Sequence, residues 1–156
     1  MASRDLLAPL IGQREETLKL LEDLSESDLD REDEAGRSVR SIVAHLASAE
    51  LGSAFVIRRA AEGDLLPISI EDRDRFNEAE AEKSRDWDLQ RLRGELADSR
   101  ESLLEAFDGL SEEDLDRHVK WPEWPARTIR TSIPYILEHE DAHVDEIRAA
   151  LGRSRE

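Results

Sequence analysis

The chain contains no cysteine. This absence excludes disulfides, zinc sites built from four cysteines, and a catalytic thiol that the protein itself supplies. It is also typical of proteins from the reducing cytoplasm, so we expect a cytoplasmic location. Any thiol that takes part in chemistry here has to come from a small molecule.

Basic residues are scarce: 22 Lys and Arg stand against 38 Asp and Glu, which gives a formal net charge of −16. A field of this sign repels phosphate backbones and anionic lipids, so we expect neither nucleic acid nor a membrane surface as a partner. Long apolar runs are lacking as well. The most apolar stretch, residues 41–57, contains His45 and Glu50 and is too short and too polar to span a bilayer. The first ten residues contain no signal-peptide pattern.

No segment shows the alternating pattern of a strand, whereas four segments show apolar residues at spacings of three and four. They cover approximately residues 3–24, 38–62, 86–107 and 128–151. Ser38 is the expected N-cap of the second helix, and Gly63 its stop. Pro134 leaves two alternatives for the last helix, which is either kinked there or begins near Thr131 or Ser132.

The connections predict how the helices are paired. The segment LSESDLDR at residues 24–31 returns as LSEEDLDR at residues 110–117, which suggests two helical hairpins. Residues 63–85 form a long crossover whose middle, residues 71–83, has the composition of a short polar helix. A chain of 156 residues is long enough to bury one core. We therefore predict an all-α fold, a four-helix bundle in one domain (residues 1–156) with a long crossover between its second and third helices.

Three of the four histidines lie in predicted helices. His139 and His143 are four residues apart, so both imidazoles lie on one helical face, and His45 lies in the second helix. Three imidazoles can bind one divalent cation such as Zn²⁺ or Ni²⁺ and leave a position open for water or substrate. The sequence thus predicts a metal site made of these histidines. Ala49 and Gly52 follow His45 at helical spacing and leave room for a pocket.

Two glutamates lie near the centres of apolar helix faces, Glu50 on the second helix and Glu140 on the fourth. A buried carboxylate has to be paired or to bind a cation. One interpretation makes these glutamates catalytic groups that move a proton, ligate metal or orient an imidazole. The other pairs each of them with an inward arginine, such as Arg14.

Residues 139–143 spell HEDAH, which has the HExxH pattern of zinc peptidases. In that interpretation His139 and His143 would bind zinc and Glu140 would activate water. The downstream metal ligand of those enzymes is missing, and no sheet is predicted to hold a peptide. A small zinc peptidase is therefore the third of the functions that we consider.

Two further segments stand out. The aromatic loop WPEWP, residues 121–125, either lines the mouth of a pocket or packs over the end of the bundle. Asn77 lies in the segment DRFN, where we expect it to hold a loop in place. His118 is expected to be a solvated loop side chain.

Three segments together resemble one family. SVRSIVAHLASAE at residues 38–50, DRFN at residues 74–77 and ILEHEDAHVDEIRAAL at residues 136–151 are similar to the DinB/YfiT-like superfamily, which includes mycothiol-dependent maleylpyruvate isomerases and thiol transferases. The resemblance implies an up-down-down-up four-helix bundle, often homodimeric. It also implies a metal held by His45, His139 and His143. Arg37 stands where the family commonly has an aromatic residue.

The leading hypothesis is a metal-dependent enzyme that acts on a small molecule, as a thiol-dependent S-transferase, a hydrolase or an isomerase. For a transferase, the resemblance implies a low-molecular-weight thiol such as mycothiol or bacillithiol. The alternative is a non-catalytic helical module for ligand binding or dimerisation.

Overall fold

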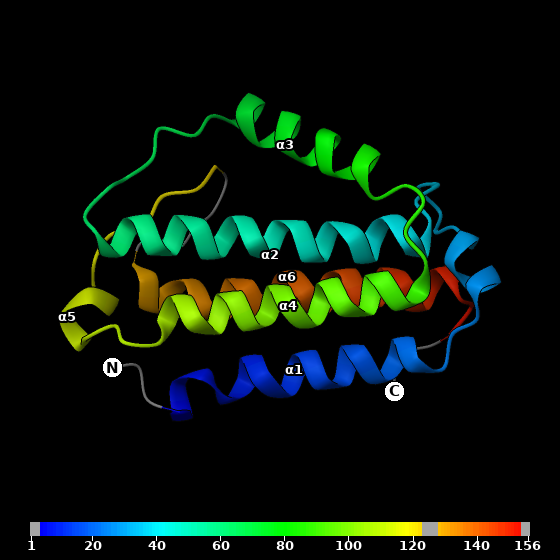
Figure 1. Ribbon diagram of the computed structural model, residues 1–156, viewed down its shortest axis with the longest axis horizontal. Coiled ribbons are helices and arrows are strands. Elements are labelled where there is room, and N and C mark those ends of the chain that lie inside the picture. Colours follow the sequence, from blue (N-terminus) through cyan, green and yellow to red (C-terminus); the bar gives the residue numbers. More distant parts are fainter. Residues whose placement is uncertain (1–3, 123–127, 154–156) are drawn as a thin grey trace.

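The computed structural model describes residues 4–122 and 128–153, and its elements are helical. In chain order they are α1 (Arg4–Glu22), the 3-10 helix η1 (Glu26–Asp30), α2 (Val39–Ala61), α3 (Ile70–Lys83), α4 (Leu89–Phe107), α5 (Glu112–Leu115) and α6 (Ile129–Ala150). Within these ranges there is no strand, only two isolated bridges. The predicted all-α class is confirmed. Figure 1 shows α1, α2, α4 and α6 side by side, with α3 set apart from them.

The helices α2, α3, α4 and α6 begin at side chains that accept a hydrogen bond from the backbone three residues further on. These caps are Ser38, Ser69, Asp88 and Thr128. The predicted cap at Ser38 is confirmed. Gly63 follows the C-cap of α2 with a φ of +84°, a conformation that favours glycine.

Two prolines lie inside helices. Pro134 is inside α6, which begins at Ile129, so the alternative start at Thr131 or Ser132 is wrong and the helix runs through this proline. Pro9 is likewise inside α1, beyond its first turn. Both prolines are exposed, so the backbone carbonyls that they leave without a helical partner can reach water.

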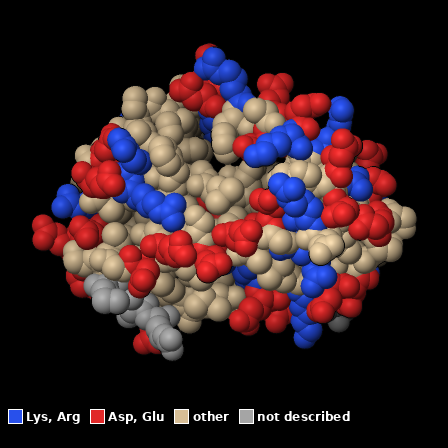
Figure 2. Space-filling model, in the orientation of Figure 1, with Lys and Arg blue, Asp and Glu red and all other residues tan. Residues whose placement is uncertain are grey.

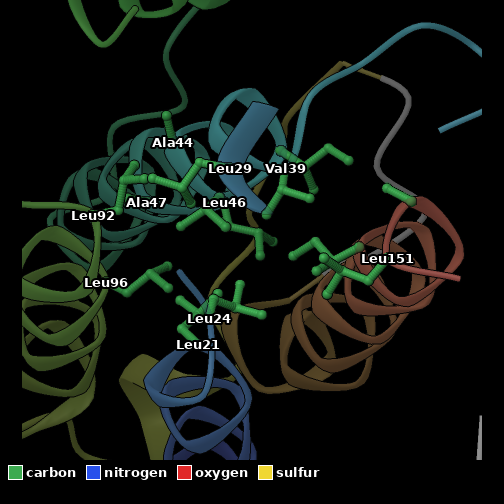
Figure 3. Packing of buried hydrophobic residues seen from close by; sticks show 14 residues of the cluster. Leu21, Leu24, Leu29, Val39, Ala44, Leu46, Ala47, Leu92, Leu96 and Leu151 are labelled. Carbon is green, nitrogen blue, oxygen red and sulfur yellow. The ribbon is translucent and has the colours of Figure 1, made fainter. Parts of the chain in front are cut away.

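Burial of apolar side chains holds the four long helices together in two separate clusters. The first includes Leu10, Ile57, Leu103 and Ile133, one from each long helix. The second includes Leu21, Val43, Leu92 and Ile147, again one from each. Figure 3 shows side chains of the second cluster pointing toward one another from different helices. Along each helix, one buried charged residue lies between the two clusters: Arg14, Glu50, Arg100 or Glu140.

The crossover contains the short polar helix that the sequence predicts. This helix, α3, has no buried residue, and it packs against α2. Acidic side chains are spread over the face shown in Figure 2, and the surface is hollowed between α2 and α3. Among the described residues no helix has the length and apolar character needed to cross a membrane.

Candidate functional site

Three imidazoles from two helices lie close together. His45 comes from α2, and His139 and His143 come from successive turns of α6. The ring centroids are 5.5 Å apart for His45 and His139, 5.0 Å for His45 and His143, and 4.6 Å for the pair on α6. The structure thus brings together all three histidines that the sequence nominates.

The chemistry of these three histidines, called the imidazole group below, fits a divalent metal. One ring nitrogen from each histidine lies within 4.8 Å of the others. Neutral imidazole nitrogens are good ligands for Zn²⁺ and Ni²⁺, and a set of three protein ligands leaves room for an exogenous one. His45, His139 and His143 are therefore the residues that would hold a metal ion.

The protonation of the imidazoles also suits a ligand role. Burial lowers the pKa of His45 to about 4, and the neighbouring His143 contributes to the shift. The pKa of His139 is also lowered to about 4, first by loss of solvent and then by the two other histidines. Both rings are consequently neutral at pH 7 and hold a free lone pair for a cation.

A carboxylate lies within hydrogen-bonding distance of one of these rings. Nδ1 of His143 lies 2.6 Å from Oε2 of Glu146, and Oε1 of Glu146 lies 2.9 Å from the Arg37 guanidinium. Burial opposes ionisation of Glu146, but hydrogen bonds from His143 and Arg37 outweigh it and lower the pKa of this carboxyl. Glu146 was not among the site residues predicted from the sequence. Its position three residues after His143 on one helix face is the signal that could have found it.

The two glutamates on the apolar faces belong to a buried charged layer. This layer consists of the four charged residues that lie between the two apolar clusters: Arg14, Glu50, Arg100 and Glu140. Glu140 accepts hydrogen bonds from Arg14, Arg100 and Thr17. Glu50 accepts from the same two arginines and from Ser99. Burial opposes ionisation of Glu140, but Arg14 outweighs it and lowers the pKa of this carboxyl.

This arrangement is the pairing alternative of the sequence analysis, with Arg14 as the expected partner. The second partner, Arg100, was not foreseen. The signal for it is its place on the apolar stripe of α4, between Leu96 and Leu103.

A cavity of about 340 Å³ adjoins the imidazoles. Its lining includes His45 and His139, together with Glu50 and Glu140 from the charged layer. The small residues Ala49 and Gly52 line it as well, which agrees with the room that their spacing predicts. A small molecule in this cavity would therefore have direct access to His45 and His139.

Aromatic side chains also line this cavity. Phe76 reaches it from α3, Tyr135 from α6 and Trp121 from the loop before α6. Trp121 also packs on the first apolar cluster, so it combines both roles considered for the aromatic loop, while Trp124 lies outside the described residues. Asn77, expected to hold a loop in place, lies within α3 and lines the cavity. His118 is exposed, as expected.

Comparison with known protein families gives one match. The sequence profile of the DinB superfamily matches residues 10–147, which include every residue of the imidazole group and of the charged layer. The chain belongs to the DinB superfamily. The resemblance seen in the three short segments is thereby confirmed. DinB proteins often bind a metal, and the imidazole group of this DinB protein is suited to one. No curated protein and no solved structure gives a significant match.

Proposed function

We propose that this DinB protein is a metal-dependent enzyme that acts on a small molecule, as a thiol-dependent S-transferase or as a hydrolase or isomerase. One observation carries the proposal: three imidazoles from two helices converge beside a cavity of about 340 Å³. A volume of this order suits a small ligand and is too little for a folded partner.

His45, His139 and His143 would hold Zn²⁺ or Ni²⁺, which supplies Lewis acidity and lowers the pKa of a bound water or thiol. The residues around it have their own tasks. Phe76 and Trp121 offer apolar surface to the body of a substrate. Because the chain has no cysteine, a thiol-dependent S-transferase reaction here requires a small thiol such as mycothiol or bacillithiol.

Elemental analysis of protein purified without an affinity tag tests the proposal. We expect about one transition metal ion per chain. His45→Ala should lose most of it, whereas His118→Ala, which changes an exposed histidine outside the site, should keep it. Full metal content in His45→Ala would show that α2 supplies no ligand and would refute the proposed site.

The contacts of Glu50 and Glu140 favour a second candidate, a non-catalytic ligand-binding module. Both carboxylates are engaged by buried arginines, so neither is held ready to accept a proton from substrate. Their assignment as catalytic groups stays a prediction. Binding of a thiol or another small molecule, with no turnover over a broad panel of substrates, would favour the module.

The same contacts weigh against the zinc peptidase. Glu140, the water-activating residue of an HExxH site, has both oxygens occupied by Arg14, and Thr17 and Arg100 donate to it as well. We expect no cleavage of casein. Cleavage that Glu140→Gln abolishes while the metal stays bound would establish the peptidase instead.

The proposal extends to the fold type, an up-down-down-up four-helix bundle that forms a homodimer. The order in which the helices meet the two apolar clusters supports the topology. Along the chain, α1 and α6 meet the first cluster before the second, whereas α2 and α4 meet the second before the first. Sedimentation analysis would test the dimer, and a monomer at all concentrations would contradict it.

A further inference from the structure

We propose that Glu146 is a positioning residue, which fixes the ring of His143 with its proton on Nδ1 and leaves Nε2 as the nitrogen that binds metal. The metal-binding half of this inference rests on the proposed function, whereas the placement of the proton does not. Two distances carry it: 2.6 Å from His143 Nδ1 to Glu146 Oε2, and 2.9 Å from Glu146 Oε1 to Arg37.

The position of the proton follows from hydrogen-bonding capacity. An ionised carboxylate can only accept, so Nδ1 of His143 has to be the donor in its contact with Glu146. A neutral imidazole has a single N–H, and its lone pair then lies on Nε2. A ligating histidine whose other nitrogen donates to a carboxylate is held in one orientation and is a more basic ligand.

Arg37 holds the supporting carboxylate in its turn. One terminal nitrogen of its guanidinium, Nη2, lies 2.9 Å from Oε1 of Glu146 and 2.9 Å from Oδ2 of Asp33. The Asp33 side chain also accepts from the backbone N–H of Arg37, which fixes this arginine at both ends. Glu146 therefore meets a cation that is already in place, which limits the entropy lost in holding the carboxylate.

This chain of contacts also joins the two helices that supply the imidazoles. Arg37 directly precedes Ser38, the N-cap of α2, while Glu146 lies one turn beyond His143 on α6. The ion pair between Arg37 and Glu146 thus links the start of the helix that contains His45 to the helix that contains the other two histidines.

Nitrogen-detected NMR of the metal-free protein, at about pH 8 and above the ordinary histidine pKa of about 6.5, tests the proton placement. In the wild type we expect the Nδ1–H form of His143, with a larger share of the Nε2–H form in Glu146→Ala. Glu146→Gln should retain much of the Nδ1–H form, because its amide oxygen can still accept. A wild-type ring with its proton on Nε2 would overturn the proposal.

Chelator competition with Zn²⁺ alone provides the second readout. We expect Glu146→Ala to bind zinc about 10- to 100-fold more weakly than the wild type, and Glu146→Gln to be intermediate. The matched control is Glu138→Ala, which removes an exposed glutamate from the same helix. Equal zinc affinity in Glu146→Ala and Glu138→Ala would overturn the positioning role. If the wild type binds no zinc, the proposed function fails, and the NMR result still decides the proton placement.

Discussion

The guanidinium of Arg14 donates to both carboxylate oxygens of Glu140, although the two residues are 126 positions apart in the chain. Both side chains are almost completely buried. Arg100 and Glu50 complete the group, so each long helix contributes one charge and the two signs are balanced. Removing one partner from such a group leaves a buried charge without compensation.

Arg14→Met should lower the free energy of unfolding by about 3–5 kcal/mol, because two buried carboxylates would then share one arginine. Urea denaturation measures the change. Arg75→Met is the matched control, since Arg75 forms an exposed pair with Asp72. The control should cost at most about 1 kcal/mol. Equal losses in the two variants would show that the buried group adds nothing specific to stability.

The metal-free protein should lose stability as the pH falls from about 6.5 toward 4. The folded state keeps His45 neutral, with a pKa of about 4, whereas the unfolded chain takes up a proton near the ordinary histidine pKa. The unfolded state therefore binds more protons in this interval, and the free energy of unfolding falls with the pH. We base this prediction on His45 because this residue is less exposed to solvent than His139.

Urea denaturation of the metal-free protein between about pH 7 and pH 5 measures this effect above the range in which carboxylates titrate. The pKa of Glu140 is lowered, so its contribution is lost only at still lower pH. His45→Gln should flatten the pH dependence, and His118→Gln, at an exposed loop position, should not. An unchanged slope in His45→Gln would contradict the prediction.

Gly52→Phe should block the cavity and spare the metal. A Cβ at this position would lie 3.7 Å from Trp121 and 4.0 Å from Phe76, which are ordinary contacts, so Gly52→Ala should fold normally. A phenyl ring there would extend into the space between these two aromatic residues. We expect at least about tenfold weaker binding of low-molecular-weight thiols or substrates, which corresponds to about 1.4 kcal/mol.

Thermal-shift titration with such ligands, together with elemental analysis, measures both halves of this prediction. Gly94→Phe is the control, because an added Cβ at Gly94 meets nothing within 4 Å. Unchanged ligand binding in Gly52→Phe would mean that the ligand lies elsewhere.

The helices and the three candidate metal ligands could be predicted from the sequence, because the helices and the pairing of His139 with His143 depend on local spacing. The caps at Ser38 and Thr128 follow local rules, and the spacing of His139 and His143 places both on one face. The sequence left open whether α6 runs through Pro134 or begins after residue 130, and the structure decides for the first alternative. His45 was included as the third histidine in a predicted helix, and the resemblance to the DinB/YfiT-like superfamily implies the same three ligands.

Local sequence patterns could not predict which residues pair with the buried charges. Glu50 and Glu140 were recognised as inward carboxylates, but only the packing of α4 shows that Arg100 reaches both. Which aromatic residues line the cavity also depends on how the helices pack, so local patterns could not predict it. Phe76 lies on a helix without buried residues, and nothing in its segment indicates which long helix it faces.

The charged layer determines how the long helices can slide. A shift of one helix by a single turn would move its charged residue about 5.4 Å along the axis. The charge would then enter one of the two apolar clusters and lose its counter-charges. The axial register of α2 against α6 is thereby locked, and with it the separation between His45 and the imidazoles of α6. The four charged residues, which also line the cavity, thus help to determine where a small molecule would meet the imidazoles.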